Sequence, residues 1–377
     1  MDQFVCVCQF SLLQPNSVAK KICNTYITSM GKFRVKPTVH DIARVAQVSL
    51  ATVDRVLNAR SGVRQKTVDK VNDAIRDLGY VRDTTAANLA RQRQYRFAFV
   101  LPDGASQFMD TIKSALHDAY ASQIADRVAL NIIAVPTHDP YALVRHLRVL
   151  DLTQLDGIAL VVPETPQIRD FVARLKQAGV AVIAVASDLP NSARDFFVGI
   201  DSVSAGRTAG LLMAKFARSE GEILVVSNSL RSRDSLERRL GFDQVLQESA
   251  AHLTVLPTLE SHDDAVRMED LVYRMLLRKP HLVGLYSMGT GNLSVLRALR
   301  RSARSADMSV IVHELTPPTR AGLLANEIDA VIAQNVGHLV RSALRVLRNL
   351  SDVAPIFEPQ ERVRIEILMR ENLQDFH

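Results

Sequence analysis

The sequence predicts an α/β protein in which a small three-helix head precedes a larger, two-lobed body. The chain has 377 residues, 47% of them apolar, which is enough for the cores of two or three compact domains. Apolar residues recur at helical spacing near the N-terminus, and from residue 96 apolar strands alternate with amphipathic helices. We expect four segments: an N-terminal extension (1–35), a helical head (36–82), a short hinge helix (83–95) and the body (96–377).

The N-terminal extension does not have the pattern of a secretory signal. Its apolar stretch follows Asp2 rather than a basic residue, Gln9 interrupts the stretch, and no small-residue cleavage site follows. Met30 is a second potential start of translation. We therefore expect residues 1–35 to be either a disordered arm or the product of a start codon placed too far upstream.

Composition excludes several classes of protein. No apolar run reaches the roughly 18 residues that a membrane-spanning helix needs. All three cysteines lie in the extension, at Cys6, Cys8 and Cys23, so neither a disulfide framework nor a cysteine-ligated zinc site is expected in the rest of the chain. These features predict a soluble protein of a reducing compartment, the cytoplasm.

Positive charge is concentrated in the head. Residues 36–95 contain 11 Lys and Arg against 6 Asp and Glu, whereas the whole chain has a net charge of only +6. A compact basic module of this kind is typical of a polyanion-binding domain, and the alternative is an ordinary solvated basic face.

The head is predicted to contain a helix-turn-helix. Thr38 and Asp41 form a capping-box pattern ahead of a first helix, a turn follows at Gln47, and Ser49 can cap a second helix over residues 50–57. A third helix is expected over residues 65–78, with Gly79 as its C-terminal stop. In such a motif the second helix fits the major groove of DNA. On that helix Leu50, Ala51 and Arg55 are predicted to point outward, and Arg55 can make a bidentate contact to guanine or, alternatively, a phosphate contact.

Four short motifs in the head resemble those of the LacI/GalR family of bacterial repressors. They are Asp-Ile-Ala at 41–43, Val-Ser-x-x-Thr-Val at 48–53, Arg-Val-Leu-Asn at 55–58 and Leu-Gly-Tyr at 78–80. The resemblance implies that Leu50, Ala51 and Arg55 face base edges and that Thr52 and Asn58 contact phosphates. It also implies that Leu89, in the hinge helix, wedges between base steps in the minor groove; the alternative is an ordinary linker with Leu89 packed on the body.

Two positions depart from the family pattern. Gln47 occupies the turn position that usually holds glycine, so either it tolerates an unusual backbone angle or the turn differs slightly. Asp54 replaces a residue that is often Ser near phosphate, and a carboxylate there would repel DNA, so we do not expect it to be a contact.

The body reads as parallel sheets with helices on both faces, in two lobes. Strands are predicted at 97–101, 129–135, 157–162, 180–186, 222–227, 253–257, 282–286, 308–313 and 330–333, with a crossing between lobes near 196–200. A final strand and tail are expected within 362–373. In open parallel sheets, ligands bind beyond the carboxyl ends of the strands.

The residues at those strand ends suit a polyhydroxylated ligand. They are polar and poor in nucleophile–base pairs, and they comprise Asp103, Ser187, Asp188, Asn228, the 287–292 loop, Glu314 and Gln334. The family resemblance extends through the body, as a periplasmic-binding-protein-like sensor domain with a Rossmann-like fold. By position it implies effector contacts from Phe108, Asp188, Arg238, Glu314 and Gln334. Asn292 is also an expected effector contact, but its match to the family is weaker, because the loop Gly289–Asn292 replaces the family's usual Asn-Asp pair.

The resemblance implies a ligand-responsive transcriptional repressor of carbohydrate or polyol metabolism genes. It would bind a palindromic operator in double-stranded DNA as a homodimer, with a sugar, polyol or sugar phosphate between its lobes. No leucine heptad follows the last strand, so a coiled-coil tetramer is not expected. A free sugar-transport protein and an enzyme are the alternatives. The basic head argues against a free transport protein. The histidines are scattered, without metal-ligand spacing or a carboxylate partner, which argues against an enzyme and a metal site. No cofactor is expected. Whether the effector releases or promotes DNA binding stays open.

Overall fold

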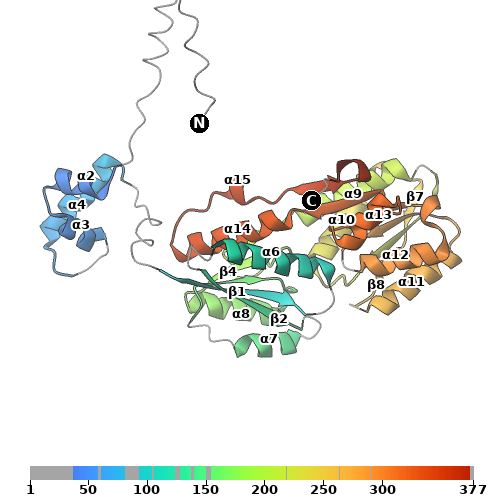
Figure 1. Ribbon diagram of the computed structural model, residues 1–377, viewed down its shortest axis with the longest axis horizontal. Helices are drawn as coiled ribbons and strands as arrows, with labels where there is room; N and C mark the ends of the chain where they lie inside the picture. Colours follow the sequence, from blue (N-terminus) through green and yellow to red (C-terminus); the bar gives the residue numbers. More distant parts are fainter. Residues whose placement is uncertain are drawn as a thin grey trace, which may run out of the picture. The chain divides into compact units, whose positions relative to one another are not determined.

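The computed structural model describes residues 37–57, 61–80, 93–103, 106–123, 128–136, 140–149, 154–217, 219–262, 264–289 and 291–373. The chain divides into two compact units, Met1–Ala87 and Asn88–His377, drawn in Figure 1. Asn58 and the predicted hinge helix with Leu89 lie outside the described residues. No helix of the described ranges is long and apolar enough to cross a membrane.

The first unit contains the predicted three helices, α2 (Val39–Ala46), α3 (Leu50–Leu57) and α4 (Gln65–Leu78). The capping box is present, since the amide of Thr38 donates to Asp41 at 2.9 Å and the amide of Asp41 donates to the Thr38 hydroxyl at 3.4 Å. Gln47 adopts a left-handed conformation, with φ of 55°. One side chain from each helix, Ile42, Val53 and Val71, is fully buried in the common core.

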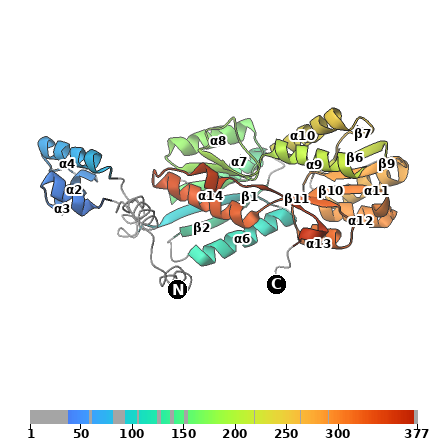
Figure 2. The ribbon, with the colours of Figure 1, turned by 90° about the horizontal axis from the view of Figure 1, so that it is seen from above.

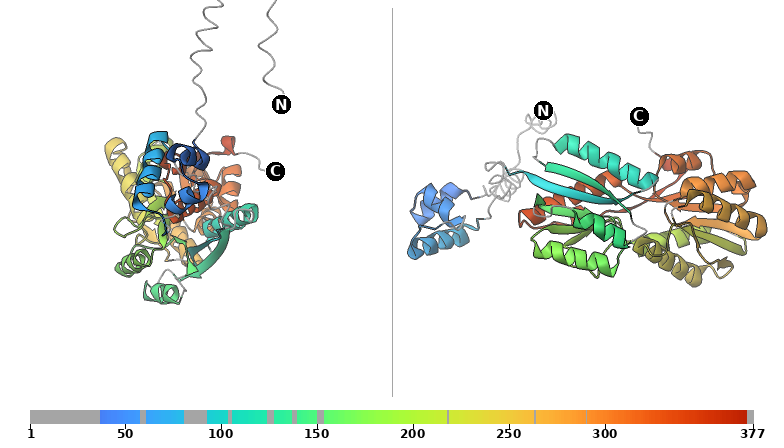
Figure 3. Two further views of the ribbon diagram at one scale, coloured as in Figure 1. Left: turned by 90° about the vertical axis from the view of Figure 1, so that its left-hand side faces the viewer. Right: turned by 90° about the horizontal axis from the view of Figure 1, so that it is seen from below.

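The first lobe of the body is a parallel sheet in the order β2-β1-β3-β4-β5. Its strands are β1 (Tyr95–Pro102), β2 (Val128–Val135), β3 (Gly157–Leu160), β4 (Ala181–Val185) and β5 (Phe196–Val198). Helices α6 (Gln107–Gln123) and α14 (Val336–Ser351) cover one face, and α7 (Pro140–Arg148) and α8 (Pro166–Gln177) cover the other (Figures 1 and 2). The right-hand view of Figure 3 shows teal α6 and green α7 and α8 on opposite sides of the sheet.

The second lobe is a seven-stranded sheet in the order β12-β11-β10-β9-β6-β7, with β8 paired to β6. Its strands are β6 (Gly221–Ser227), β7 (Leu253–Val255), β8 (Leu259–Glu260), β9 (Leu282–Ser287), β10 (Ser309–His313), β11 (Ala330–Gln334) and the antiparallel β12 (Ile365–Leu368). Helices α9 (Ser202–Phe216) and α10 (Arg233–Ser249) pack on one face. Helices α11 (Ala265–Arg278), α12 (Asn292–Ser302) and α13 (Pro317–Leu324) pack on the other, and short α15 (Glu358–Glu361) follows α14.

The predicted α/β class and the two lobes are confirmed, and two strands differ from the expectation. The segment expected only to cross between lobes first pairs with β4 as β5, and β8 is a two-residue strand. Strands this short have no alternation of apolar and polar residues to detect, so only their tertiary pairing defines them. The chain then crosses near residue 200, again between β11 and α14, and a third time between α14 and β12.

Two glycines allow α9 and α10 to pack with their backbones in close approach. A Cβ atom on Gly206 would lie 2.0 Å from the carbonyl oxygen of Arg238, and one on Gly241 would lie 2.1 Å from the carbonyl oxygen of Val203. Both distances are far below van der Waals contact, so neither position accepts a side chain without moving a helix. This contact fixes where α10 places Arg238.

A charged cluster holds the first described residues of the body to the end of α14. Arg93 donates to Asp352 at 3.0 Å and to Asp156 at 3.2 Å, and the Tyr95 hydroxyl donates to Asp352 at 2.7 Å. Arg93 and Arg348 also lie over the Tyr95 ring, 5.2 and 5.4 Å from its centroid. The segment that leads into β1 is therefore fixed to the C-terminus of α14.

We predict that Gly206→Ala lowers the free energy of unfolding by about 1–3 kcal/mol, because the added methyl group overpacks the α9–α10 contact. Urea denaturation measures this change. Gly337→Ala in α14 is the matched control, because its Cβ would meet side-chain atoms rather than backbone: the end of Arg341 at 3.0 Å and the Asn335 Oδ1 at 3.5 Å. Alanine there should be neutral or stabilise by up to about 1 kcal/mol. Equal losses of unfolding free energy in both variants would contradict the close α9–α10 packing at Gly206.

Candidate functional site

The exposed side of α3 is the first candidate site. Leu50 is 43% exposed, and Ala51 and Arg55 are exposed as well, whereas Val53 on the opposite side is fully buried. Thr52 is half-buried, and its hydroxyl lies 2.9 Å from that of Ser49 at the helix start. The helix thus exposes a small apolar surface and one guanidinium, which suit base edges in the major groove, together with the carboxylate of Asp54.

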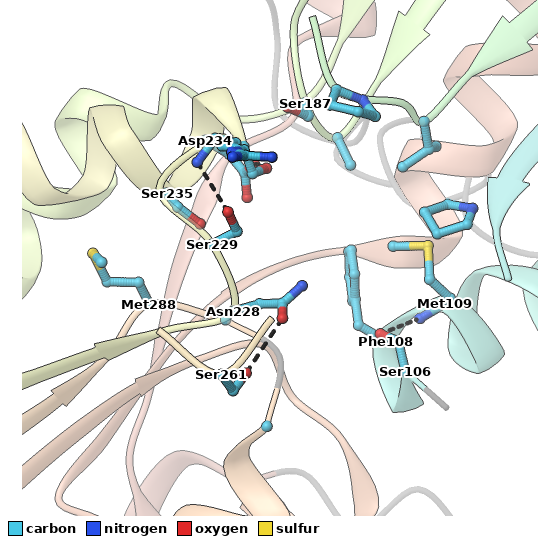
Figure 4. Close-up of a pocket in the computed structure, with 18 of the residues that line it drawn as sticks. Ser106, Phe108, Met109, Ser187, Asn228, Ser229, Asp234, Ser235, Ser261 and Met288 are labelled. Atoms are coloured by element: carbon cyan, nitrogen blue, oxygen red, sulfur yellow. Dashed lines mark hydrogen bonds between the residues drawn. The ribbon is translucent and has the colours of Figure 1, made fainter. Parts of the chain in front are cut away.

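The second candidate site is a cavity of about 1200 Å³ between the two lobes of the body. It lies at the carboxyl ends of strands from both sheets, where the fold class predicts ligand binding. In Figure 4, Phe108 and Met109 of α6 lie opposite Asn228 and Ser261 of the second lobe. Five of the sequence-predicted effector residues line this cavity: Asp103, Phe108, Arg238, Glu314 and Gln334.

Arg238 is the most constrained polar side chain of the cavity. It is 3% exposed, and its Nη1 donates to the carbonyl oxygen of Met288 at 2.7 Å while its Nη2 donates to Glu314 Oε1 at 3.2 Å. Asp234, one turn earlier on α10, lies 3.8 Å from the same guanidinium. The Nε of Arg238 is buried and has no hydrogen-bond partner among the described residues.

Glu314 is held between Arg238 and Gln334. The amide nitrogen of Gln334 donates to Glu314 Oε1 at 3.0 Å, so two donors converge on one carboxylate oxygen. Burial raises the pKa of Glu314, and Arg238 opposes that shift. The Oε1 of Gln334 is buried and has no partner among the described residues, which leaves an acceptor as well as a donor in the cavity.

Three non-glycine residues of the cavity have left-handed backbone conformations. The φ angles of Ala186, His262 and Glu314 are 62°, 55° and 70°. Such conformations cost free energy in residues with a Cβ atom, and they persist where the surrounding structure imposes them, often at binding sites. Ala186 and Glu314 directly follow β4 and β10, so the strain occurs where the strands end at the cavity.

Behind Arg238, the cavity is supported by an aromatic pair and a histidine. Phe242 and Tyr286 stack with centroids 4.4 Å apart, and the Tyr286 hydroxyl lies 2.8 Å from Nε2 of His313. His313 is fully buried, and burial together with the positive charge of Arg238 lowers its pKa well below 6.5. It is therefore a neutral structural group at neutral pH.

Asp188 and Asn292 are not among the lining residues. Asp188 forms a bidentate ion pair with Arg194, with one bond of 2.7 Å, and accepts from the amide of Leu189. Asn292 donates to the carbonyl oxygen of His313 at 2.7 Å and accepts from the Ser287 hydroxyl at 2.6 Å, which braces the second lobe from inside. Their neighbours Ser187 and Gly291 line the cavity instead.

Several lining residues were not singled out from the sequence. Asp234 and Ser235 precede Arg238 by one helical turn, so helical periodicity could have identified them. Glu164 and Thr165 follow β3 and were accessible to the strand-end argument. Ser261, His262 and Asp264 follow β8, which is too short to be read from the sequence. Within the described ranges, no group of His, Cys, Asp and Glu could hold a metal ion.

Comparison with known proteins assigns both parts of the chain. Residues 97–353 match the periplasmic binding protein domain family, and residues 38–83 match the lacI family of bacterial regulatory proteins. The fold and the cavity define a two-lobed binding protein with a helix-turn-helix head. The chain belongs to the periplasmic binding protein domain family, and its head matches the lacI family of bacterial regulatory proteins.

Individual relatives agree with this assignment. The HTH-type transcriptional regulator DegA of Bacillus subtilis is 24% identical over 57% of this chain, which spans 62% of that relative's length. A solute binding protein of Burkholderia graminis, solved in complex with D-arabinose, is 21% identical with a TM-score of 0.67 over 75% of this chain and 98% of its own. A putative LacI transcriptional regulator from Bacteroides fragilis is 19% identical with a TM-score of 0.64 over 76% of this chain and 100% of its own. These relatives are regulators and binding proteins rather than enzymes, as expected from the sequence.

We predict that His313 makes stability depend on pH. Because its folded pKa lies below the unfolded value of 6.5, the unfolded chain takes up a proton first as the pH falls. Stability is therefore lost below pH 6.5, by at most about 1.4 kcal/mol per pH unit. The raised pKa of Glu314 acts in the opposite direction, so the measurement is the difference between wild type and His313→Gln in urea denaturation from pH 8 to pH 5. Parallel curves would contradict the prediction.

Proposed function

We propose that this protein is a transcriptional repressor that binds a palindromic operator as a homodimer and responds to a sugar or polyol between its lobes. The observation that carries the proposal is the presence, in one chain, of a helix-turn-helix with an exposed arginine and a large polar cavity. The genes it controls would serve carbohydrate or polyol metabolism, and it would act in the cytoplasm, where its DNA is.

The properties of α3 support DNA recognition. Its exposed residues, Leu50, Ala51 and Arg55, are the base-reading positions that the family resemblance implies, and the same resemblance implies a phosphate contact from Thr52. One three-helix head makes few phosphate contacts, so useful affinity needs two heads on a twofold-symmetric site. Asn58 and Leu89 remain proposed contacts from the family resemblance alone.

The chemistry of the cavity supports a polyhydroxylated effector. Arg238 offers an unused donor and Gln334 an unused acceptor, both buried, and a hydroxyl group can serve either. Phe108 supplies an apolar surface of the kind that packs against a sugar ring. Asp103 on the first lobe and Glu314 on the second place carboxylates on both sides, so one ligand can contact both lobes.

A continuous path in the body supports coupling between the effector and the hinge. Gln334 lines the cavity, Asn335 caps α14, and α14 spans about 24 Å to Asp352, which holds Arg93. A ligand shifts the equilibrium only if it binds one arrangement of the lobes more tightly than the other. Movement of α14 with the first lobe would then move Arg93, which lies at the end of the predicted hinge segment next to β1.

We predict that Arg55→Ala lowers affinity for the specific operator by about 1–3 kcal/mol and leaves affinity for random DNA nearly unchanged. The operator is first selected from a random duplex library and then titrated in gel-shift experiments, which also count the chains bound per site. Arg76→Ala is the control. It removes the same charge from α4, where the side chain is 76% exposed and bonded to Asp73. An equal loss for Arg55→Ala on all DNA would identify a phosphate contact instead, and one chain per site would contradict the dimer.

We predict that Arg238→Ala gives a folded dimer that binds operator but no longer responds to its effector. Coupling of about 1–3 kcal/mol is typical of such linkage and is measured by operator titration with and without effector. Arg239→Ala is the matched control, since Arg239 bonds Asp243 at 2.7 Å and Thr258 at 2.6 Å and does not line the cavity. A normal effector response in Arg238→Ala, or loss of the response in Arg239→Ala, would show that the effector response does not depend on Arg238.

A further inference from the structure

Acidic side chains outnumber basic ones around the cavity. Among the described lining residues, carboxylates outnumber guanidinium groups: the acids are Asp103, Glu164, Asp234, Asp264 and Glu314, and the bases are Arg231 and Arg238. Arg231 is exposed to solvent, where its charge is screened. The charge that a deeply bound ligand meets therefore depends mainly on Arg238 and its neighbours.

Arg238 is already neutralised by the protein. Two of its nitrogens are engaged, by the Met288 carbonyl at 2.7 Å and by Glu314 at 3.2 Å, and Asp234 lies 3.8 Å away. Both members of the Arg238–Glu314 pair are at least 96% buried, so little solvent weakens their attraction. Nε is the one nitrogen of this guanidinium without any partner among the described residues, and the paired carboxylates leave little net positive charge for the ionised oxygens of a phosphate.

The other arginines of α10 near the cavity do not line it and are paired with carboxylates, one of which, Glu164, does line it. Arg233 donates to Glu237 at 2.6 Å and lies 3.7 Å from Glu164. Arg239 pairs with Asp243 on the same helix. Neither lines the cavity, so α10 supplies no second guanidinium to hold an anion there.

The cavity also offers acceptors for a ligand's hydrogen-bond donors. Gln334 Oε1 is buried without a donor among the described residues, and the carboxylate of Asp103 lies exposed in the lining. A buried acceptor left unpaired costs free energy, so the favoured ligand brings hydrogen-bond donors. Hydroxyl and ammonium groups donate, whereas an ionised phosphate or carboxylate only accepts.

We propose that the effector is a polyhydroxylated molecule that is uncharged or carries an amine, and that Glu314 excludes phosphorylated sugars by neutralising Arg238. The inference rests on the proposed function and narrows its effector class. Glu314 thereby determines specificity through Arg238, in addition to any contact of its own with the ligand.

The first test compares matched compounds on the full-length protein. Pentoses, hexoses and polyols are screened by thermal shift as the free compound, the phosphate ester and, where it exists, the amino derivative, and dissociation constants of binders are measured by calorimetry. We expect each phosphate ester to bind at least tenfold more weakly than its free parent. A phosphate ester that binds as tightly as its parent would overturn the inference and leave the proposed function intact. Binding of no compound in any form would overturn the proposed polyhydroxylated effector, and the inference with it.

The second test changes the counter-ion. Glu314→Gln keeps the side chain's shape and leaves Arg238 without its buried carboxylate, so the ratio of dissociation constants, phosphate ester to parent, should fall at least tenfold. Asp243→Asn is the matched control, because it unpairs Arg239, the next arginine on α10, outside the cavity. Its ratio should equal that of wild type. An unchanged ratio in Glu314→Gln, or an equal fall in Asp243→Asn, would overturn the role of Glu314. If Glu314→Gln does not fold, the wild-type comparison still decides the effector class.

Discussion

The close packing of α9 against α10 is the constraint on which the cavity depends. Gly206 and Gly241 bring the two helix backbones together, and this contact sets the position of Arg238 on α10. From there the guanidinium reaches the end of β9 through Met288 and the residue after β10 through Glu314. A buried charge is tolerated only when it is paired and hydrogen-bonded, so Arg238, Glu314 and Gln334 form one interdependent unit.

A second constraint comes from the chain's three crossings between lobes. Because α14 follows β11 of the second lobe but packs on the sheet of the first, the two lobes share a hydrophobic core as well as a cavity. The same helix begins beside Gln334 and ends at the Asp352–Arg93 ion pair. The cavity and Arg93, the first described residue of the body, are thus connected through one helix.

Local features of this fold could be read from the sequence to within a residue or two. The third helix of the head was expected over 65–78 and is found at Gln65–Leu78, because its apolar spacing and Gly79 act over a few residues. An unusual backbone angle was one of the two alternatives expected at Gln47, and it is present. The strands β8 and β5 were not predicted, because they are too short for any local pattern and form only by pairing with their neighbours in the sheet.

The sequence by itself determined the α/β class, the helix-turn-helix with its outward-facing Arg55, and the edge of the sheets where polar residues gather. It could do so because periodicity, capping and strand direction depend on neighbouring residues. Tertiary structure decided which partner each polar side chain found. Asp188 lies at the predicted strand end yet pairs with Arg194, and Asn292 bonds the carbonyl of His313, 21 residues away. Arg238 and Glu314 meet across 76 residues, and Asp234 joins the cavity only because α10 turns it there. Hydrogen bonds and ion pairs form over about 3 Å, and only the folded chain brings groups so far apart in sequence to that distance.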